Sequence, residues 1–337
     1  MKIKIAINGF GRVGRTAFKI AWKRSDVEIV AINDLSDAKT LAHLLKHDST
    51  YHNYGWFQTI EAGNNSITVD GIKIPILSEK DPSRLPWKKL DVDVVVESTG
   101  FFTEYKKSKA HIKAGAKKVV ISAPCKGTGV KTILLGVNDG DLKKTDKVIS
   151  NGSCTTNCVA PLLRVLEDTI GIKKSMMTTI HSYTNSQNLQ DAPHKKLRES
   201  RAAAENIIPT STGAATSVGE AMPEELGEFN GLSIRVPTPI VSLVDLTAIT
   251  EKKITKEKLN LIFEKAAKEA RWQGILATSD EELVSSDFIG NSHSAIVDLN
   301  LTDVVAGDLI KIVAWYDNEW GYSNRLVELC VDAHNCA

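Results

Sequence analysis

Short runs of β-branched and aliphatic residues alternate with helical patterns in the first half of the chain. Between the first two runs, a glycine-rich turn precedes a helical pattern that ends near Trp22. Two later runs flank Asp70-Gly71, a strong signal for a β-hairpin. Such alternation predicts a mostly parallel sheet covered by helices, an α/β domain. The predicted strands are Ile3–Ile7, Val27–Ile32, Ile67–Val69, Ile72–Ile76, Val92–Val96, Val119–Ser122, Ile133–Leu135 and Val148–Ser150.

The pattern changes after Ser150. Helices are predicted at about Thr155–Asp168, Glu257–Arg271 and Glu319–His334. The strands are longer than in the first half, and few helices join them. This pattern is typical of an α+β domain with a mixed or antiparallel sheet. The predicted strands are Met176–His181, Ile234–Val236, Val241–Ile249, Ala295–Asn300 and Ile310–Tyr316.

A long polar segment, from Ser182 to about Asn206, has no predicted helix or strand. A loop of this length inside a compact domain tends to be functional. The alternative interpretation is a solvated excursion on the surface. Its basic and ring-bearing residues are Pro193, His194, Lys195, Lys196, Arg198 and Arg201.

Composition and charge narrow the class of protein. The 337 residues are 42% hydrophobic and 25% charged, as in a soluble globular protein with room for two domains. A formal net charge of +1 gives no case for a nucleic-acid or membrane-surface partner. The lysines of Lys106–Lys118 alternate with apolar residues, so a solvated helix face is favoured over a phosphate or nucleic-acid patch.

The cysteines and the apolar runs favour a cytoplasmic protein. No run approaches the roughly 18 apolar residues that a membrane-spanning helix needs. The five cysteines are odd in number and lack the spacing of a disulfide framework. Cys154 and Cys158 have no histidine pair at zinc-ligand spacing, so we expect no metal site.

A Gly-x-Gly-x-x-Gly motif, Gly9 to Gly14, directly follows the first predicted strand and begins the first predicted helix. Gly9 permits a tight turn, Gly11 allows the backbone to approach a pyrophosphate, and Gly14 allows the helix to lie close to the sheet. The N–H groups at Arg12 and Val13 would meet the anion at the helix N-terminus. The motif alone recurs by chance, but this context favours dinucleotide binding over a purely structural role.

Asp34 closes the second predicted strand at the distance from the motif where a carboxylate accepts hydrogen bonds from a ribose. The same carboxylate repels a 2′-phosphate, so NAD is favoured over NADP. The pattern therefore predicts a Rossmann-type dinucleotide domain. Further cofactor contacts are expected at the carboxyl ends of the strands, from Thr99-Gly100 and Ser122.

Cys154 lies between a predicted strand and a predicted helix. The N–H groups and positive dipole of a helix N-terminus stabilise a thiolate, so we expect a lowered pKa for Cys154. Cys158 lies one turn further along and is expected to be a packed thiol. His181 ends the following strand among polar residues and is the candidate general base and acid. A lone cysteine in such a turn is otherwise more often structural.

Nine blocks of residues together resemble glyceraldehyde-3-phosphate dehydrogenases from end to end, in order and approximate spacing. The blocks are Ile7–Arg15, Ile32–Asp34, Ser98–Gly100, Ser122–Pro124, Ser153–Cys158, His181–Thr184, Ile208–Ala215, Arg235–Pro239 and Trp315–Tyr322.

The resemblance implies a phosphorylating, NAD-dependent aldehyde dehydrogenase of glycolysis or gluconeogenesis. Cys154 would add to glyceraldehyde 3-phosphate, with help from His181, and inorganic phosphate would release the thioester as 1,3-bisphosphoglycerate. Thr184 and Arg235 would hold the substrate's phosphate. The implied contacts of the attacking phosphate are Ser153, Thr155, Thr212 and Gly213. Erythrose-4-phosphate dehydrogenase, a closely similar enzyme that hydrolyses its thioester, is the alternative.

The same resemblance implies an NAD-binding domain over residues 1–152, completed by a C-terminal helix over 318–337, and a catalytic domain over 153–317. It implies a homotetramer in which the long loop packs beside a neighbouring subunit's cofactor. Asn318 would anchor the nicotinamide carboxamide. The cofactor-binding positions implied by motif and resemblance are Gly9, Gly11, Arg12, Val13, Gly14, Asp34, Lys80, Thr99, Ser122, Asn318 and Tyr322.

Four positions depart from the family's usual pattern. Gly152 stands where a small residue with a Cβ is usual. Glu199 stands where many bacterial relatives carry a second arginine, so no arginine of that stretch is assigned to a substrate phosphate. Lys80 replaces an arginine near the adenine, where we expect a weaker contact. Ala192 replaces a bulkier residue near the adenosine ribose, which leaves tolerance of NADP open.

Overall fold

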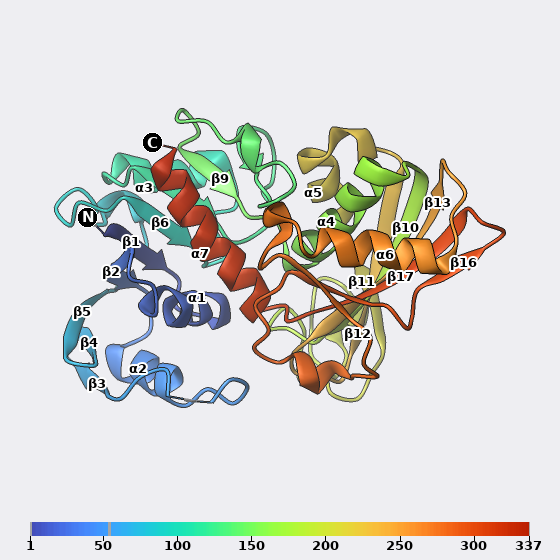
Figure 1. Ribbon diagram of the computed structural model, residues 1–337. Helices are drawn as coiled ribbons and strands as arrows, with labels where there is room; N and C mark the ends of the chain where they lie inside the picture. Colours follow the sequence, from blue (N-terminus) through green and yellow to red (C-terminus); the bar gives the residue numbers. More distant parts are fainter. Residues whose placement is uncertain (1, 53–54, 337) are drawn as a thin grey trace. The chain divides into compact units, whose positions relative to one another are not determined.

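The computed structural model describes residues 2–52 and 55–336, which form two compact units (Figure 1). The first unit comprises the chain up to Ile133, Asp139–Gly152 and the residues from Ser323 onward. The second comprises Leu134–Asn138 and Ser153–Tyr322. Leu134–Asn138 contacts the rest of the second unit, where Arg271 Nε donates a hydrogen bond to the carbonyl oxygen of Gly136 at 2.5 Å.

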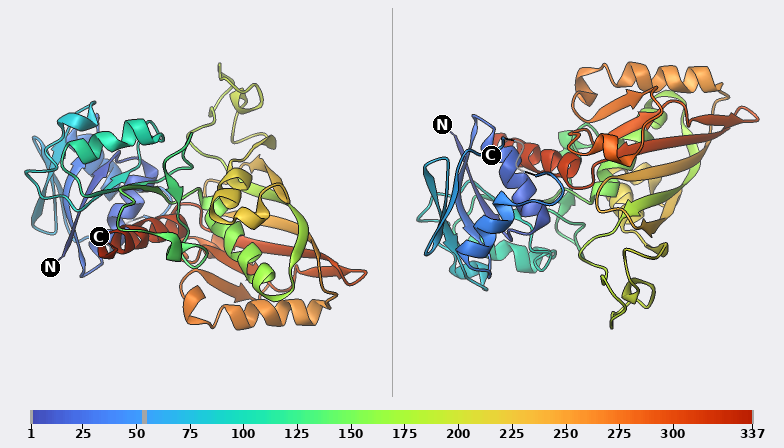
Figure 2. Two further views of the ribbon diagram at one scale, coloured as in Figure 1. Left: turned by 90° about the horizontal axis from the view of Figure 1, so that it is seen from above. Right: turned by 90° about the horizontal axis from the view of Figure 1, so that it is seen from below.

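The first unit is built on a nine-stranded sheet in the order β3-β4-β5-β2-β1-β6-β7-β9-β8. The pairs from β5 to β8 are parallel, and β3, β4 and β5 form an antiparallel meander. Helices lie on both faces of the sheet (Figure 2), which is why its central strands are apolar on both faces. The strands are β1 (Ile3–Asn8), β2 (Val27–Asn33), β3 (Ile60–Gly63), β4 (Ser66–Val69), β5 (Ile72–Leu77), β6 (Val94–Glu97), β7 (Lys118–Ile121), β8 (Lys131–Thr132) and β9 (Val148–Ser150). The helices are α1 (Arg12–Trp22), α2 (Ala38–Lys46), α3 (Tyr105–Lys113) and, from Ser323 onward, the C-terminal α7 (Trp320–Asn335).

Two local predictions for this unit have opposite outcomes. The hairpin is confirmed, because β4 pairs antiparallel with β5 and both Asp70 and Gly71 have positive φ, 49° and 80°. The strand predicted at Ile133–Leu135 is wrong. These residues are buried, but the strand is the shorter β8 that precedes them. The sequence predicted a strand here because a buried segment of any backbone conformation has the apolar composition of a strand.

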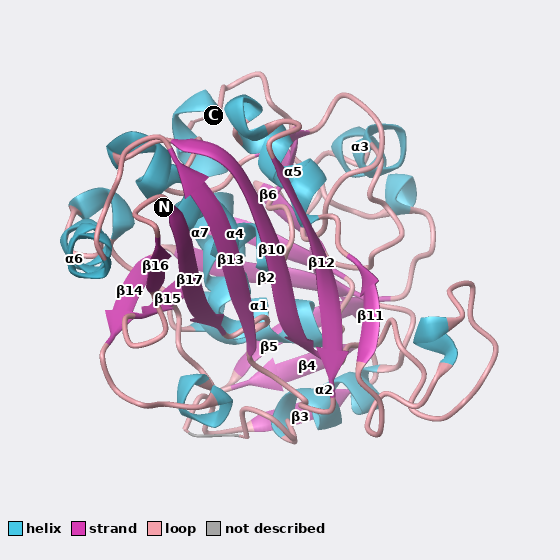
Figure 3. Cartoon of the chain, turned by 90° about the vertical axis from the view of Figure 1, so that its right-hand side faces the viewer, coloured by secondary structure: helices cyan, strands magenta, loops and turns pink. Residues whose placement is uncertain are grey.

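The second unit is built on a mixed sheet in the order β11-β12-β10-β13-β17-β15-β14, with β16 paired to β17. β10 pairs parallel with β12 and antiparallel with β13, so the predicted fold class is confirmed. Figure 3 shows β10, β12, β13 and β17 side by side. The strands are β10 (Ile172–Ser182), β11 (Ile208–Ser211), β12 (Phe229–Val236), β13 (Ser242–Thr250), β14 (Leu276–Ser279), β15 (Ala295–Asp298), β16 (Asp303–Val305) and β17 (Leu309–Tyr316). The helices are α4 (Cys154–Thr169), α5 (Ala214–Ala221) and α6 (Lys256–Ala266).

Candidate active site

The start of α4 is fixed by a capping box. Ser153 Oγ accepts a hydrogen bond from the backbone N–H of Thr156 at 3.0 Å, and Thr156 Oγ1 accepts one from the N–H of Ser153 at 3.3 Å. The preceding Gly152 has a φ of +61°, which glycine adopts without a Cβ clash. The sequence therefore places Cys154 at the first position of the helix, next to the backbone N–H groups that have no partner within it.

Cys154 and His181 meet in the structure. Cys154 Sγ lies 3.4 Å from His181 Nε2, within the contact distance of a hydrogen bond to sulfur. Cys154 comes from the beginning of α4, and His181 comes from the carboxyl end of β10. Cys158 is fully buried one turn later, as predicted for a packed thiol.

Arg235 lies beside the other ring nitrogen of His181. The parallel register of β10 and β12 pairs His181 with Arg235. Arg235 Nη1 lies 2.6 Å from His181 Nδ1 and donates a hydrogen bond to the carbonyl oxygen of Ser182 at 3.1 Å. His181 Nδ1 lies 2.7 Å from the same carbonyl oxygen. Nδ1 cannot donate to Ser182 and accept from Arg235 at once, so these two contacts correspond to different tautomers of His181.

Burial and Arg235 set the protonation of this pair. Burial raises the pKa of the Cys154 thiol, whereas the charge of Arg235 and hydrogen bonds from Thr155 act in the opposite direction. The predicted lowering of the Cys154 pKa is therefore wrong for this structure, because burial outweighs the helix N-terminus. Burial and Arg235 also lower the pKa of His181 to about 3. His181 is thus a neutral base facing a neutral thiol.

Tyr316 packs against His181 and the first turn of α4, and its role was not predicted from the sequence. Its hydroxyl lies 3.0 Å from Thr155 Oγ1 and 2.9 Å from Thr179 Oγ1, and its ring meets His181 edge-on at 6.0 Å between centroids. Thr155 is itself buried, so its hydroxyl is directed at Tyr316 in this structure. Tyr316 lies within the Trp315–Tyr322 block, but its role could not be predicted because the two threonines lie far away along the chain.

Asn318 has its amide oriented by two serines. Its Oδ1 accepts hydrogen bonds from Ser182 Oγ at 2.9 Å and from Ser242 Oγ at 3.0 Å. The amide nitrogen is therefore identified as the group that can donate to a ligand. Val241 precedes Ser242 with a φ of +67°, a strained conformation for a β-branched residue that costs about 1–3 kcal/mol. Tyr322 is buried in α7.

The other residues predicted to bind phosphate lie on the loop after β10 and at the start of α5. Thr184 Oγ1 lies 3.0 Å from Ser186 Oγ. Thr212 Oγ1 accepts a hydrogen bond from the N–H of Ala214 at 3.2 Å, and Gly213 is the N-cap residue of α5. The structure thus gives both threonine hydroxyls protein partners, and their contacts with phosphate stay predictions.

The long loop contains an ion pair between Lys196 and Glu199. Glu199 is nearly buried and accepts a hydrogen bond from Thr210 Oγ1, while Lys196 Nζ lies 2.9 Å from its carboxylate. Lys196 and Arg198 also line a cavity of about 450 Å³ together with β11. Arg201 pairs instead with Asp191 at 3.0 Å. Glu199 therefore joins the loop to β11.

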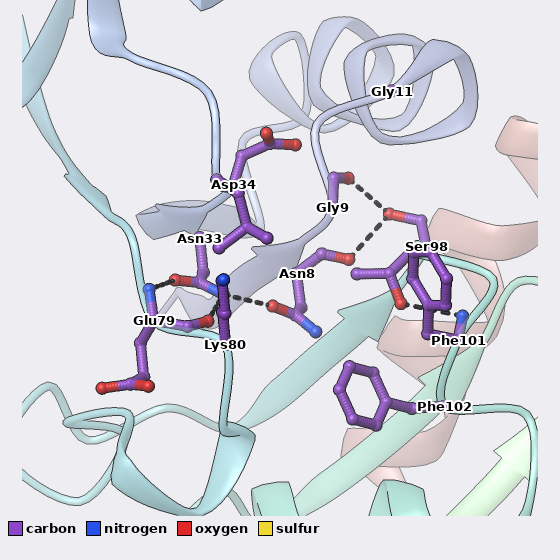
Figure 4. A pocket seen from close by; sticks show the side chains of 12 residues that line it. Asn8, Gly9, Gly11, Asn33, Asp34, Glu79, Lys80, Ser98, Phe101 and Phe102 are labelled. Atoms are coloured by element: carbon purple, nitrogen blue, oxygen red, sulfur yellow. Dashed lines mark hydrogen bonds between the residues drawn. The ribbon is translucent and has the colours of Figure 1, made fainter.

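The glycine motif of the first unit borders a cavity of about 530 Å³ at the ends of β1, β2 and β6 (Figure 4). A Cβ at Gly14 would lie 2.1 Å from the carbonyl oxygen of Gly9, so α1 approaches the turn as only glycine permits. A Cβ at Gly9 would lie 2.7 Å from the backbone nitrogen of Thr99. At Gly11 no atom lies within 4 Å of such a Cβ, so this backbone faces open space. The cavity is lined by Asn8, Gly9, Gly11, Asn33, Asp34, Leu35, Glu79, Lys80, Ser98, Thr99, Phe101 and Phe102.

Asp34 anchors the motif as well as lining the cavity. Its Oδ2 accepts a hydrogen bond from the N–H of Phe10 at 2.8 Å, and its Oδ1 accepts one from the N–H of Ser36 at 2.9 Å. Each oxygen keeps lone pairs for a ribose hydroxyl. The cavity fits a dinucleotide, because it combines open space over Gly11, a carboxylate at the end of β2 and an apolar wall at Phe101. The two phenylalanines of this wall were not predicted.

Three other predicted cofactor residues have defined places. Arg12 Nη1 donates to Asp48 Oδ1 at 3.0 Å, and its guanidinium lies over the Tyr51 ring. Val13 lies in the first turn of α1. The backbone N–H of Ser122 donates to the carbonyl oxygen of Glu97 at 2.9 Å at the end of β7.

No helix among the described residues is long and apolar enough to cross a membrane. The same residues contain no group of three or more potential metal ligands.

Comparisons with known proteins agree along both units. Residues 3–105 match the family described as glyceraldehyde 3-phosphate dehydrogenase, NAD binding domain, and residues 153–318 match its C-terminal domain. The glyceraldehyde-3-phosphate dehydrogenase of Borreliella burgdorferi is 52% identical over 97% of this chain and 98% of its own length. That of Geobacillus stearothermophilus is 51% identical over 98% and 97%. The chain therefore belongs to the glyceraldehyde 3-phosphate dehydrogenase family.

Proposed function

We propose that the protein oxidises glyceraldehyde 3-phosphate with NAD and inorganic phosphate to give 1,3-bisphosphoglycerate, a step of glycolysis or gluconeogenesis. The observation that carries the proposal is the 3.4 Å contact between Cys154 Sγ and His181 Nε2. A thiol next to a neutral imidazole is the pair that covalent catalysis on an aldehyde needs. The family membership supplies the substrate class.

In the first step, Cys154 Sγ adds to the aldehyde carbon. The thiol proton moves to Nε2 of His181 while the S–C bond forms, and Nε2 then passes this proton to the former carbonyl oxygen, which becomes a hydroxyl. This transfer requires the tautomer in which Nδ1–H donates to Ser182 and the Nε2 lone pair faces the sulfur. Because burial raises the pKa of the Cys154 thiol, the free protein keeps the proton on sulfur until a substrate is present.

In the second step, the hemithioacetal is oxidised to a thioester. NAD, when bound, supplies the acceptor for the hydride. His181 Nε2, once it has given up the first proton, takes the hydroxyl proton as the hydride leaves carbon. The C=O bond forms again, and the acyl group stays on Cys154. Inorganic phosphate then attacks the acyl carbon, the S–C bond breaks, and the leaving sulfur takes the proton that His181 Nε2 holds.

Arg235 has two partners in this scheme. In the structure its guanidinium lies against His181, where it disfavours the imidazolium. A substrate phosphate held by Arg235 and Thr184 would draw the guanidinium away from Nδ1 and neutralise part of its charge. Both changes favour proton transfer from Cys154 to His181. Substrate binding would in this way activate the nucleophile.

We assign the cofactor contacts to groups in each of the two units. In the first unit, the backbone of Gly11, Arg12 and Val13 at the start of α1 suits the pyrophosphate, and Asp34 suits the adenosine ribose. In the second, the amide nitrogen of Asn318 suits the carboxamide oxygen of nicotinamide, because its own oxygen is already occupied. Contacts from Lys80, Thr99, Ser122 and Tyr322 complete the proposed set.

The assembly and location are proposed from the family membership. We infer a cytoplasmic homotetramer in which the segment from Ser182 to about Asn206 contacts a neighbouring subunit. Exposed apolar side chains on this segment and next to it are consistent with such a contact, namely Leu189, Leu197 and Ile207. Analytical ultracentrifugation of the purified protein tests the stoichiometry.

The decisive assay measures NADH formation from glyceraldehyde 3-phosphate with and without phosphate or arsenate. We expect turnover only when one of these anions is present, and its loss in Cys154→Ser. Full turnover by Cys154→Ser would refute the mechanism. Preferential activity on erythrose 4-phosphate that ignores phosphate would favour the hydrolytic alternative. Running the assay in parallel with NADP measures the tolerance associated with Ala192.

A further inference from the structure

Glu97 is a buried carboxylate with an unusual number of hydrogen-bond donors around it. It is the last residue of β6, and 1% of its surface is exposed. Its Oε2 accepts hydrogen bonds from Asn8 Nδ2 at 2.5 Å and faces His111 Nε2 at 2.9 Å. Its Oε1 accepts from both the backbone N–H and the hydroxyl of Thr99. A carboxylate buried this deeply is stable only with such complete pairing.

The positions of the protons on His111 and Glu97 follow from a neighbouring indole N–H, which donates hydrogen bonds and cannot accept them. Trp87 Nε1–H can only donate, and it lies 2.9 Å from His111 Nδ1, so Nδ1 must carry a lone pair. The proton of the neutral ring is therefore on Nε2, where it is donated to Glu97. All four groups around Glu97 donate hydrogen bonds to it, so none is left to accept one from a carboxyl proton. Glu97 is therefore the ionised carboxylate. Trp87 and His111 are both fully buried, which fixes this arrangement.

The donors of Glu97 belong to two sides of the dinucleotide cavity. Thr99 lies in the turn after β6 and lines the cavity. Asn8 ends β1, and its Oδ1 accepts a hydrogen bond from Asn33 Nδ2 at 2.7 Å. Asn33 in turn bonds both backbone groups of Glu79, at 2.9 Å each. Figure 4 shows this chain from Glu79 through Asn33 to Asn8 along the cavity that Lys80 and Asp34 border.

We propose that Glu97 is a positioning residue for NAD binding. One carboxylate, oriented by His111 and Trp87, holds the turn at Thr99 with one oxygen and the Asn8–Asn33 chain with the other. The two sides of the cavity therefore keep the spacing that a dinucleotide needs before it arrives. This inference rests on the proposed use of NAD, and it adds residues that would not touch the cofactor.

Glu97→Gln tests the proposal with little change of shape. The new amide replaces one acceptor oxygen with an N–H donor, which then faces the donor of either Asn8 or Thr99. The hydrogen bond to that residue is lost, and its side of the cavity is no longer held in place. In the full-length protein we expect KM for NAD to rise about tenfold. At saturating NAD, kcat should stay within about twofold of the wild type, because the reacting groups belong to other residues.

Asp93→Asn is the matched control. Asp93 is a buried carboxylate next to the opposite end of the same strand, where it accepts hydrogen bonds from the N–H of Lys4 and from Lys117 Nζ. Its loss should lower the thermal midpoint without changing KM for NAD. If both variants raise KM equally, general loosening of the unit explains the effect and the proposal is wrong.

A second pair of variants decides the question if Glu97→Gln does not fold. His111→Leu removes the donor that orients Glu97, whereas His111→Gln places an amide N–H near the position of Nε2. We expect KM for NAD to rise about fivefold in the first variant and to return toward the wild-type value in the second. Equal KM values in His111→Leu and the wild type would overturn the proposal.

The wild-type protein provides an independent signature. In ¹⁵N spectra, the ring of His111 should show the Nε2–H tautomer with its bonded proton, and this signal should persist with and without NAD. An Nδ1–H tautomer would refute the arrangement. These results are separable from failure of the proposed function, since a wild-type protein that neither binds NAD nor oxidises glyceraldehyde 3-phosphate would refute that function whatever the state of Glu97.

Discussion

Replacing Gly11 with alanine separates cofactor binding from folding at the glycine motif. Gly11 has a φ of −70° and a ψ of −159°, which alanine adopts without strain, and no atom lies within 4 Å of the place its Cβ would take. Gly→Ala exchange at a compatible position stabilises a protein by about 0.4–1 kcal/mol through the unfolded chain. The Gly11→Ala protein should therefore melt at the wild-type temperature or slightly above it.

The same methyl group should weaken NAD binding strongly. It would project into the cavity of about 530 Å³, where the proposed pyrophosphate approaches the N–H groups at the start of α1. Losing one hydrogen bond to a charged group costs about 1.5–3 kcal/mol, which corresponds to about a 10- to 100-fold increase in Kd. Isothermal titration with NAD, together with a thermal melt of each sample, measures both effects.

Gly14→Ala is the contrasting variant. Its Cβ would lie 2.1 Å from the carbonyl oxygen of Gly9, so α1 or the turn must move, at a cost of about 1–3 kcal/mol in the free energy of unfolding. Affinity and stability should fall together there, whereas in Gly11→Ala only affinity falls. Wild-type NAD affinity in Gly11→Ala would refute the assignment of this cavity to the pyrophosphate.

Three further predictions concern the second unit. Arg235→Leu removes a charge that lowers the pKa of His181, so this pKa should rise in a pH titration followed by NMR; an unchanged or lower pKa would contradict this role. Burial and Glu167 raise the pKa of Glu225 to about 7, so its contribution to stability is lost as the pH rises from about 4 through 7. Glu225→Gln should leave the free energy of unfolding unchanged near pH 4 and raise it by up to about 3 kcal/mol near pH 8, and an equal gain at both values would disprove the cause. Tyr316→Phe deprives two buried threonine hydroxyls of a partner and should cost about 1–2 kcal/mol in urea unfolding, a value that a loss below about 0.5 would exclude.

Strands and helices with a regular pattern could be predicted from the sequence, while short elements could not. The pattern placed β9 and the hairpin at Asp70-Gly71 correctly, because local turn chemistry and apolar runs determine them. It missed α5 and β11, which are short and consist largely of small and hydroxyl-bearing residues. The apolar residues after β8 were misread as a strand because a buried segment without a backbone partner in the sheet has the same composition.

Buried polar groups were the hardest to predict. The lysine-rich stretch was interpreted as a solvated helix face, and most lysines of α3 are indeed exposed. The same helix buries His111, whose partners lie on β6 and in the segment around Trp87. Lys19 is also buried, in a pair with Asp48 at 2.7 Å. Nothing in the local sequence separates these side chains from their exposed neighbours, since their partners come from other elements.

The environment of Cys154 shows why a motif does not determine reactivity by itself. The position at a helix N-terminus follows from the local sequence, and from it alone a lowered thiol pKa was predicted. The structure adds burial, which raises that pKa, and Arg235, which opposes the rise. Arg235 reaches the site only because β12 pairs in parallel with β10, in a register where it stands opposite His181. A slip of one residue would turn its side chain to the other face of the sheet and remove the charge from both catalytic groups. The reactivity of the nucleophile therefore depends on strand pairing as much as on the residues next to it.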